Sequence, residues 1–105
     1  MSKILSIALN PAIDISSDAD VVRHTHKTRT HNQRQHAGGG GINVARVIVE
    51  LGGKCELLYL SGGATGTLLE SMLKPLGIKE HRYPIHDPVR VAFNVRELST
   101  NLEYR

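Results

Sequence analysis

The residues best suited to chemistry surround four consecutive glycines, Gly38 to Gly41, which open directly into a helical pattern. Glycines lack a Cβ, so a ligand can approach their backbone closely and positive φ angles are accessible. A helix N-terminus also presents free backbone N–H groups and the positive end of the helix dipole. Asn43 adds a side-chain amide on the first turn. We therefore predict a site for a polar or anionic ligand; the alternative is a tight turn before a packed helix.

A carboxylate follows the first predicted strand. Residues 3–9 form a nearly continuous apolar run, which is typical of a strand covered on both faces. Asn10-Pro11 ends this run with turn chemistry, and Asp14 comes just after it. Ligands of open α/β sheets bind at the carboxyl edge of the strands. Asp14 is therefore a candidate ligand contact, with a cap or an Asx turn as the alternative role.

Positive charge is concentrated near the glycines. No acid lies between Asp20 and Glu50, although the whole chain has a formal net charge of only +3. The cations in this interval are Arg23, Lys27, Arg29, Arg34 and Arg46. Such a field favours an anion. A small phosphate ester needs few cations, whereas single-stranded nucleic acid would need aromatic stacking partners that this segment lacks. We expect a small phosphorylated partner and no nucleic acid.

The segment 15–36 is polar and has no helical periodicity. The alternation of Thr, Val and His over 21–31 predicts an exposed, twisted ribbon. The histidines of this segment are His24, His26, His31 and His36. His-x-His pairs can chelate metals, but no carboxylate or thiol stands beside them in the sequence. We therefore predict a solvated face that carries ligand-binding cations and no metal site.

Helical and strand patterns alternate after the glycine run. We predict a helix over 41–51, a strand over 54–60 and a parallel βαβ crossover between the first two strands. A second glycine-rich turn, 61–66, leads to a helix over 67–76 that Gly77 caps, and the structural reading of this turn is favoured over ligand contact. Further strands are expected over 83–85, 89–98 and 102–105.

Size and composition restrict the class of protein. A chain of 105 residues is at most one small domain or a piece of a larger one. Cys55 is the single cysteine, which excludes a disulfide framework and fits a buried thiol in a reducing compartment. No run approaches the ~18 apolar residues of a membrane span, and the first five residues lack the long apolar region of a signal peptide. We expect a cytoplasmic protein with no membrane partner.

Several motifs together resemble one family. The motifs are Leu-Asn-Pro-Ala-Ile-Asp at 9–14, Gly-Gly-Gly-Gly-Ile-Asn-Val-Ala-Arg at 38–46, Leu-Gly-Gly at 51–53 and Gly-Gly-Ala-Thr-Gly at 62–66. In order and spacing they resemble the N-terminal third of the ribokinase-like (phosphofructokinase B) carbohydrate kinases, over essentially all 105 residues. Gly40 and Gly-Gly-Ala-Thr-Gly resemble the minor type of 6-phosphofructokinase more than 1-phosphofructokinase or tagatose-6-phosphate kinase. The dinucleotide-binding alternative lacks Gly-x-Gly-x-x-Gly after the first strand.

The resemblance implies a fold and a set of roles. It implies the N-terminal part of a three-layer α/β sandwich, with residues 1–105 in one sugar-kinase domain and the strands of a small β-lid within about 15–36 and 89–105. It implies that Asp14 holds sugar hydroxyls and that Gly38, Gly39 and Asn43 line the sugar. Lys27 and Arg90 would pair with the sugar phosphate, since a phosphate requires charged donors.

The resemblance also implies an activity that these residues do not complete. Family members transfer a phosphoryl group from ATP, with Mg²⁺, to an alcohol group of a carbohydrate, and often dimerise through the lid. Their catalytic carboxylate and nucleotide pocket belong to a Gly-Ala-Gly-Asp segment, which we expect beyond residue 105. Phosphoryl transfer depends on positioning and electrostatic stabilisation, so we expect this chain alone to bind a fructose 6-phosphate-like acceptor without turnover. The alternative is a non-catalytic module for sugar phosphates or other anions.

Overall fold

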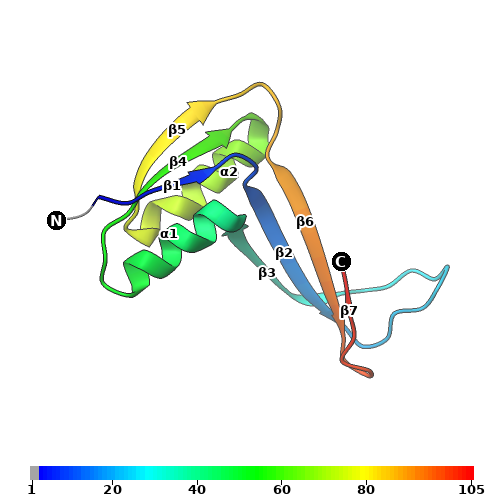
Figure 1. Cartoon of the computed structure of the whole chain (residues 1–105). Coiled ribbons are helices and arrows are strands. Elements are labelled where there is room, and N and C mark those ends of the chain that lie inside the picture. The colour runs from blue at the N-terminus through cyan, green and yellow to red at the C-terminus, as the bar shows by residue number, and fades with distance from the viewer. Residues whose placement is uncertain (1–2) are drawn as a thin grey trace.

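A computed structural model describes residues 3–105, and the first two residues of the N-terminal stretch considered above lie outside this range. The first of its two sheets is parallel and has the order β1-β4-β5. Its strands are β1 (Leu5–Ala8), β4 (Glu56–Ser61) and β5 (Lys79–Pro84). The helices α1 (Gly40–Glu50) and α2 (Gly63–Leu73) connect and cover these strands (Figure 1). The predicted parallel crossover between the first two strands is confirmed, because β1 pairs with β4 in parallel.

The second sheet has the order β3-β2-β6-β7 and extends away from the helices (Figure 1). Its strands are β2 (Ala12–Ala19), β3 (His31–Gly38), β6 (Arg90–Glu97) and β7 (Glu103–Tyr104). The central strand β2 runs antiparallel to β3 and parallel to β6. Since β3 leads through Gly39 into α1, this sheet joins the helix layer at the glycine run.

The apolar core lies between the first sheet and the two helices. Leu57 and Tyr59 of β4 are 0% and 2% exposed, and the facing side chains Ile42 and Leu69 are 0% exposed. Alternate residues of β4 are buried, as expected for a strand with one covered face. Burying several such side chains is the main favourable contribution to folding. This core fixes the position of α1, and therefore of the glycine run at its N-terminus.

The prediction that residues 3–9 are covered on both faces is wrong for this chain. Both helices pack on one face of the first sheet, where Ser6 and Ala8 are buried. Leu5 and Ile7 are 54% and 53% exposed on the opposite face. The continuous apolar run indicates that both faces of the strand are apolar. The described residues cover only one of these faces.

Two further predictions about elements need correction. Helix α2 begins at Gly63 instead of residue 67, because the glycines are part of the helix: a Cβ on Gly66 would lie 2.5 Å from Ser61 Oγ. The α-helix ends at Leu73, and the short 3₁₀ turn η1 (Lys74–Leu76) precedes Gly77, which has φ 74°. The strand expected over 83–85 is β5, which begins at Lys79 and is exposed along its edge.

The ribbon predicted over 21–31 is also not formed as a strand. Residues 21–30 make an exposed loop and turn, and the paired strands are β2 and β3 on either side of it. Two strands were predicted within 15–36, and the strands on either side of the loop run from Ala12 to Ala19 and from His31 to Gly38. The strands expected within 89–105 are β6 and β7. Among residues 3–105, no helix is long and apolar enough to cross a membrane.

Candidate functional site

The glycine run joins β3 to α1 with a backbone that requires glycine. Gly39 has φ 108°, a region that L side chains rarely adopt. Its carbonyl accepts the first helical hydrogen bond, from the backbone N–H of Asn43 at 3.0 Å. A Cβ on Gly41 would lie 2.5 Å from the carbonyl oxygen of Ile7. Glycine at position 41 therefore allows α1 to pack directly against β1.

Asp14 lies directly over Gly38. A Cβ built on Gly38 would come 2.0 Å from Asp14 Oδ2 and 2.4 Å from its Cγ. The carboxylate thus occupies the space that any other residue at position 38 would need. Asp14 was predicted to lie in a turn beyond the first strand, but it belongs to β2, whose pairing with β3 brings it to the glycine run. Two of the predicted site residues are therefore in contact.

Asp14 lines a hollow formed by residues of β2, β3 and β6 together with Arg105, which we call the Asp14 hollow. Its volume is about 320 Å³. The lining residues are Asp14, Ile15, Ser16, His36, Ala92, Phe93, Asn94 and Arg105. His36 Nε2 lies 3.5 Å from Asp14 Oδ2, and the two residues are paired in the sheet register. The small side chain of Ala92, on the other side of Asp14, leaves room for a ligand.

The Asn43 side chain is held by Arg46, which was predicted only to contribute positive charge. Arg46 Nη1 donates to Asn43 Oδ1 at 3.2 Å, and Arg46 Nη2 also donates to the carbonyl of Ala37, the residue before the glycines. Arg46 therefore ties the first turn of α1 to the end of β3. The i, i+3 spacing of Asn43 and Arg46 on a helix was the signal that could have shown this contact.

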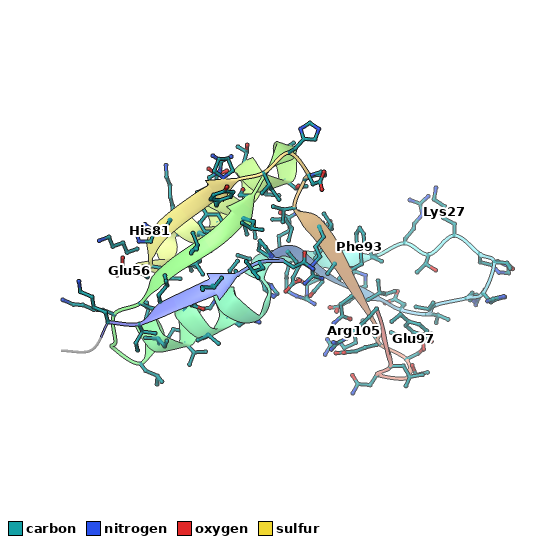
Figure 2. The ribbon with its side chains drawn as sticks, turned by 45° about the horizontal axis from the view of Figure 1, so that its top comes forward. Lys27, Glu56, His81, Phe93, Glu97 and Arg105 are labelled. Carbon is teal, nitrogen blue, oxygen red and sulfur yellow. The ribbon has the colours of Figure 1, made fainter. Side chains whose placement is uncertain are left out.

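The two predicted phosphate partners lie in different places. Arg90 begins β6 opposite Ala12, and its Nε and Nη2 both lie 3.4 Å from the carbonyl oxygen of Asn10. Register places Arg90 on the same face of β6 as Ala92, the neighbour of Asp14. Lys27 lies on the 21–30 loop, beyond the second sheet and away from the helices (Figure 2). Lys27 lines a separate hollow of about 280 Å³. Lys27 and Asp14 therefore do not share a hollow in this structure.

Buried carboxylates hold the second sheet in register around Asp14. Asp18 is 5% exposed. The pKa of Asp18 is lowered chiefly by the hydrogen bond from Asn32, at 3.1 Å, and also by Arg34, at 3.4 Å. Arg96 of β6 lies 3.6 Å away. Since its partners come from both neighbouring strands, Asp18 joins β3, β2 and β6.

Glu97 serves the other side of the sheet and is 4% exposed. The pKa of Glu97 is lowered by hydrogen bonds from the Thr100 hydroxyl and from the backbone N–H of Val22, the latter at 2.7 Å. These contacts attach the turn after β6 to the start of the 21–30 loop. Neither carboxylate was predicted to be buried, because both occur in polar stretches.

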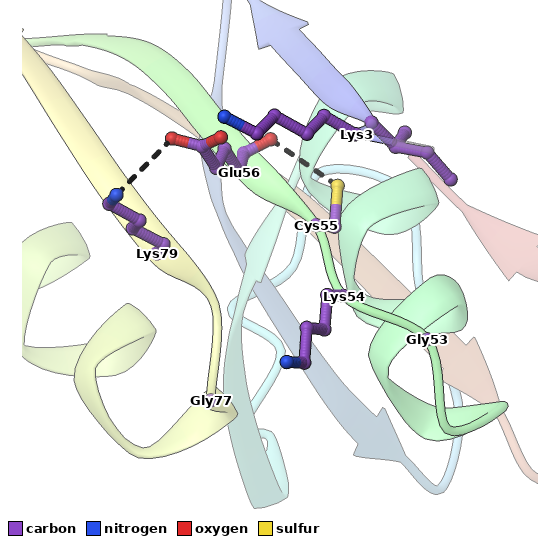
Figure 3. Close-up of a pocket in the computed structure, with 8 residues that line it drawn as sticks. Lys3, Gly53, Lys54, Cys55, Glu56, Gly77 and Lys79 are labelled. Atoms are coloured by element: carbon purple, nitrogen blue, oxygen red, sulfur yellow. Dashed lines mark hydrogen bonds and ion pairs between the residues drawn. The ribbon is translucent and has the colours of Figure 1, made fainter. Parts of the chain in front are cut away.

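A larger hollow of about 490 Å³ lies at the opposite end of the first sheet. It is lined by Lys3, Ile4, Gly53, Lys54, Cys55, Glu56, Gly77 and Lys79 (Figure 3). Lys79 Nζ lies 3.7 Å from Glu56 Oε1, and the Cys55 thiol donates to the carbonyl of Glu56 at 3.3 Å. These residues are at the amino ends of the strands, whereas ligands of open α/β sheets bind at the carboxyl ends. None of the predicted site residues lines this hollow.

The histidines do not form a metal centre with acids or cysteines. Within residues 3–105, no three His, Cys, Asp or Glu side chains are placed to hold a metal ion. His24 and His26 lie on the exposed loop, where His26 Nδ1 is 2.9 Å from the carbonyl oxygen of His24. His36, one of the four histidines considered as metal ligands, instead lies beside Asp14.

A three-stranded parallel sheet whose carboxyl edge meets a glycine-rich helix N-terminus, with a four-stranded sheet beside it, defines an α/β protein with a candidate ligand site at that edge. The sequence profile of the pfkB family carbohydrate kinases matches residues 3–105. The chain belongs to this family, and the resemblance seen in its motifs is confirmed.

Two curated relatives share its sequence closely. The chain is 43% identical over 103 residues to the ATP-dependent 6-phosphofructokinase isozyme 2 of Mycobacterium tuberculosis, covering 98% of this chain and 30% of that protein. It is 31% identical over 105 residues to the enzyme of the same description from Escherichia coli, covering 100% of this chain and 34% of that protein. The chain thus spans about a third of the length of the curated relatives it matches.

Solved structures share the fold. The crystal structure of phosphofructokinase-2 from Escherichia coli in complex with fructose-6-phosphate matches with a TM-score of 0.94 and 31% identity, covering 100% of this chain and 35% of that one. A possible 1-phosphofructokinase from Thermotoga maritima matches with a TM-score of 0.85 at 20% identity, which concerns the fold alone. The predicted fold class, the N-terminal part of a ribokinase-like α/β fold, is confirmed.

Proposed function

We propose that this chain forms the acceptor-binding part of an ATP-dependent kinase whose substrate is a sugar phosphate like fructose 6-phosphate. Membership of the pfkB family and the similarity to 6-phosphofructokinases support this proposal. The observation that carries it is that the Asp14 carboxylate lies over Gly38, the last residue of β3, two residues before α1 begins. A carboxylate accepts hydroxyl hydrogen bonds, while bare backbone at a helix N-terminus offers donors, and a polyhydroxylated ligand needs both.

The proposal gives each predicted residue a role. Asp14 accepts hydrogen bonds from sugar hydroxyls, Gly38 and Gly39 contribute backbone N–H groups, and the Asn43 amide, oriented by Arg46, borders the sugar. Arg90 supplies donors for the phosphate, because its guanidinium uses only part of its capacity on Asn10. Lys27 joins this set only if the 21–30 loop folds toward Asp14.

Turnover requires more than these residues provide. In the proposed reaction a hydroxyl oxygen of the bound sugar attacks the γ-phosphorus of ATP; ADP leaves, and the hydroxyl proton passes to a base. We propose that the base, the ATP site and the Mg²⁺ ligands lie outside this chain, which then binds the acceptor without phosphorylating it. ATP supplies the phosphoryl group; the residues described here position the acceptor that receives it.

Calorimetry of the full 105-residue chain with fructose 6-phosphate tests the proposal. We expect saturable binding that Asp14→Ala weakens at least tenfold, since the carboxylate is the principal hydroxyl acceptor. Asp20→Ala is the matched control, because Asp20 is exposed and lies outside the Asp14 hollow. Equal affinities of the two variants would contradict the role of Asp14. A steady-state assay with ATP and fructose 6-phosphate should show no product, and clear turnover by this chain would contradict the division of labour.

We also propose that the complete protein is a cytoplasmic homodimer joined through the second sheet. One face of this sheet carries exposed aromatic side chains, Phe93 at 64% and Tyr104 at 43%. Register places both on the face opposite Asp14, where a second sheet could pack. Light scattering should give a dimer mass that Phe93→Ser reduces to the monomer.

A further inference from the structure

A second hollow lies next to the Asp14 hollow, and we call it the arginine hollow. Its volume is about 320 Å³. The lining residues are Ser16, Ser17, Arg34, Asn94, Arg96 and Glu103. Ser16 and Asn94 line both hollows, so the two are neighbours on the second sheet. None of the residues proposed to bind the sugar lines the arginine hollow, which therefore has no role in the proposed function.

Strand register brings two arginines to this hollow from opposite sides of β2. Arg34 of β3 is paired with Ser16, and Arg96 of β6 is paired with Asp18. Arg34 Nη2 lies 3.4 Å and Arg96 Nε lies 3.6 Å from the same oxygen, Asp18 Oδ1. Because Asp18 is buried, its carboxylate holds both guanidinium groups close to each other. Donors that are already in place lose little conformational freedom when a ligand binds.

Both arginines keep donors available for a ligand. A guanidinium group has five N–H donors. Arg34 donates from Nη1 to the Asn32 carbonyl at 2.9 Å and from Nη2 to Asp18. Arg96 faces Asp18 through Nε, and its Nη1 and Nη2 have no hydrogen-bond partner among residues 3–105. The two side chains are 46% and 48% exposed, so a ligand in the arginine hollow can reach the remaining donors.

The charges around the hollow leave an excess of positive charge. Asp18 contacts two arginines but neutralises only one charge. Glu103 is the acid among the lining residues, and its Oε2 lies 3.2 Å from Arg105 Nη2. Three arginines therefore stand against two carboxylates in this group. Such a balance favours an anion, and the Ser16 hydroxyl adds a neutral donor at the wall of the hollow.

We propose that the arginine hollow is a second anion site, which binds a phosphate group between Arg34 and Arg96. A phosphate group presents several acceptor oxygens and can receive charge-assisted hydrogen bonds from two guanidinium groups at once. Inorganic phosphate and a phosphate ester both carry this group. Since the site does not include Asp14, the inference goes beyond the proposed function and does not depend on it.

Titration of the full ¹⁵N-labelled chain with inorganic phosphate, at constant pH and ionic strength, tests the site. We expect saturable shifts of the backbone amide signals of Ser16, Arg34 and Arg96. Arg96→Gln should weaken phosphate binding about tenfold, because charge-assisted donors are lost. Shifts confined to the amides of residues 38–43 would place the phosphate at the proposed sugar site and would overturn the inference.

Two further substitutions separate a local site from general charge. Glu103→Gln removes the carboxylate that lines the hollow, so it should tighten phosphate binding about two- to fivefold. Arg29→Gln removes the same charge as Arg96→Gln, but from the exposed 21–30 loop, and it should change the affinity by less than about twofold. Equal losses in Arg29→Gln and Arg96→Gln would mean that only net charge matters, which would also overturn the inference.

Thermal unfolding without phosphate shows whether each variant folds. If Arg96→Gln does not fold, Glu103→Gln decides the matter, because unchanged or weaker phosphate binding in that variant contradicts the site. Titration with fructose 6-phosphate then distinguishes the two sources of the phosphate group: shifts at the arginine hollow with both ligands indicate a site that accepts esters, and shifts with inorganic phosphate alone indicate a site for the free ion. Asp14→Ala should leave inorganic phosphate binding unchanged, whereas a loss there would overturn the inference that the two sites are separate.

Discussion

In the first sheet, β4 packs against two helices through Leu57 and Tyr59, which are 0% and 2% exposed, whereas the second sheet buries the carboxylates of Asp18 and Glu97. The first arrangement depends on apolar area removed from water, which is favourable but not directional. The second depends on hydrogen bonds and ion pairs from neighbouring strands, which are directional. We therefore infer that the first sheet contributes mainly to stability and that the second sheet mainly positions the site residues.

The position of the Asp14 carboxylate depends on the register of β2. The contacts of Asp18 with β3 and β6 hold β2 in the register that sets Asp14 opposite His36 and over Gly38. A one-residue slip of β2 would turn Asp14 to the other face of the sheet. We infer that the polar interior of the second sheet fixes the geometry of the site, while the core of the first sheet supplies most of the stability.

The largest expected effect is on the core of the first sheet. Leu57→Ala should lower the free energy of unfolding by about 2–5 kcal/mol, because it removes a fully buried side chain and leaves a cavity. Urea unfolding followed by circular dichroism measures this change. Leu98→Ala, in the turn that follows β6, is the control, since Leu98 is 45% exposed, and it should change stability by no more than about 0.5 kcal/mol. Similar losses in both variants would contradict the comparison.

The next effect concerns the junction of the two sheets. Gly38→Ala should weaken fructose 6-phosphate binding at least tenfold, about 1.4 kcal/mol, because its Cβ would displace the Asp14 carboxylate. Gly40→Ala is a matched control from the same run, since no atom lies within 4 Å of its Cβ position. Calorimetry of both variants measures the difference. Equal effects of the two substitutions on affinity would contradict the prediction that binding depends on the space between Gly38 and Asp14.

A smaller effect is expected from the buried charge of the second sheet. The folded pKa of Asp18 lies below its ordinary value of 3.8, so its contribution to stability is present above that value and is lost as the pH falls through the lowered folded pKa. Asp18→Asn should reduce stability at pH 7 by less than Leu57→Ala does, and should make the loss of stability in acid less steep.

Urea midpoints measured between pH 7 and pH 2 test this prediction. Arg34, Arg96 and Asn32 face Asp18 in the wild-type chain, while Glu56 and Glu97, whose pKa values are also lowered, keep their own contributions in both proteins. An acid limb of the same steepness in the wild-type chain and in Asp18→Asn would show that Asp18 is not a source of acid sensitivity.

The smallest effect is expected on the loop. Arg29→Ala should change the free energy of unfolding by less than about 0.5 kcal/mol, because the side chain is exposed on the 21–30 loop. Thermal unfolding measures the change. A loss of several degrees in the melting temperature would mean that the Arg29 side chain packs on the second sheet. The prediction that the 21–30 loop contributes little to stability would then be wrong.

Much of the first sheet could be predicted from the sequence. The helix expected over 41–51 and the strand expected over 54–60 correspond to α1 and β4, because the helix has apolar residues at helical spacing and the strand is rich in Leu. The edge strand β5 was largely missed, since Lys79 to Pro84 is mostly polar and becomes a strand through its pairing with β4. The 21–31 ribbon was wrong for a related reason: β-like alternation does not form a strand without a partner.

The sequence by itself determined the residue types of the site: a run of four glycines, an Asn on the first helical turn and an acid after the first strand. It also determined the family, because these motifs occur in a specific order and spacing. Only the tertiary structure decided that Asp14 lies over Gly38 and that Lys27 lies apart from Asp14. These relations depend on the register of strands that are distant in sequence, and register is set by cooperative packing that no local pattern encodes.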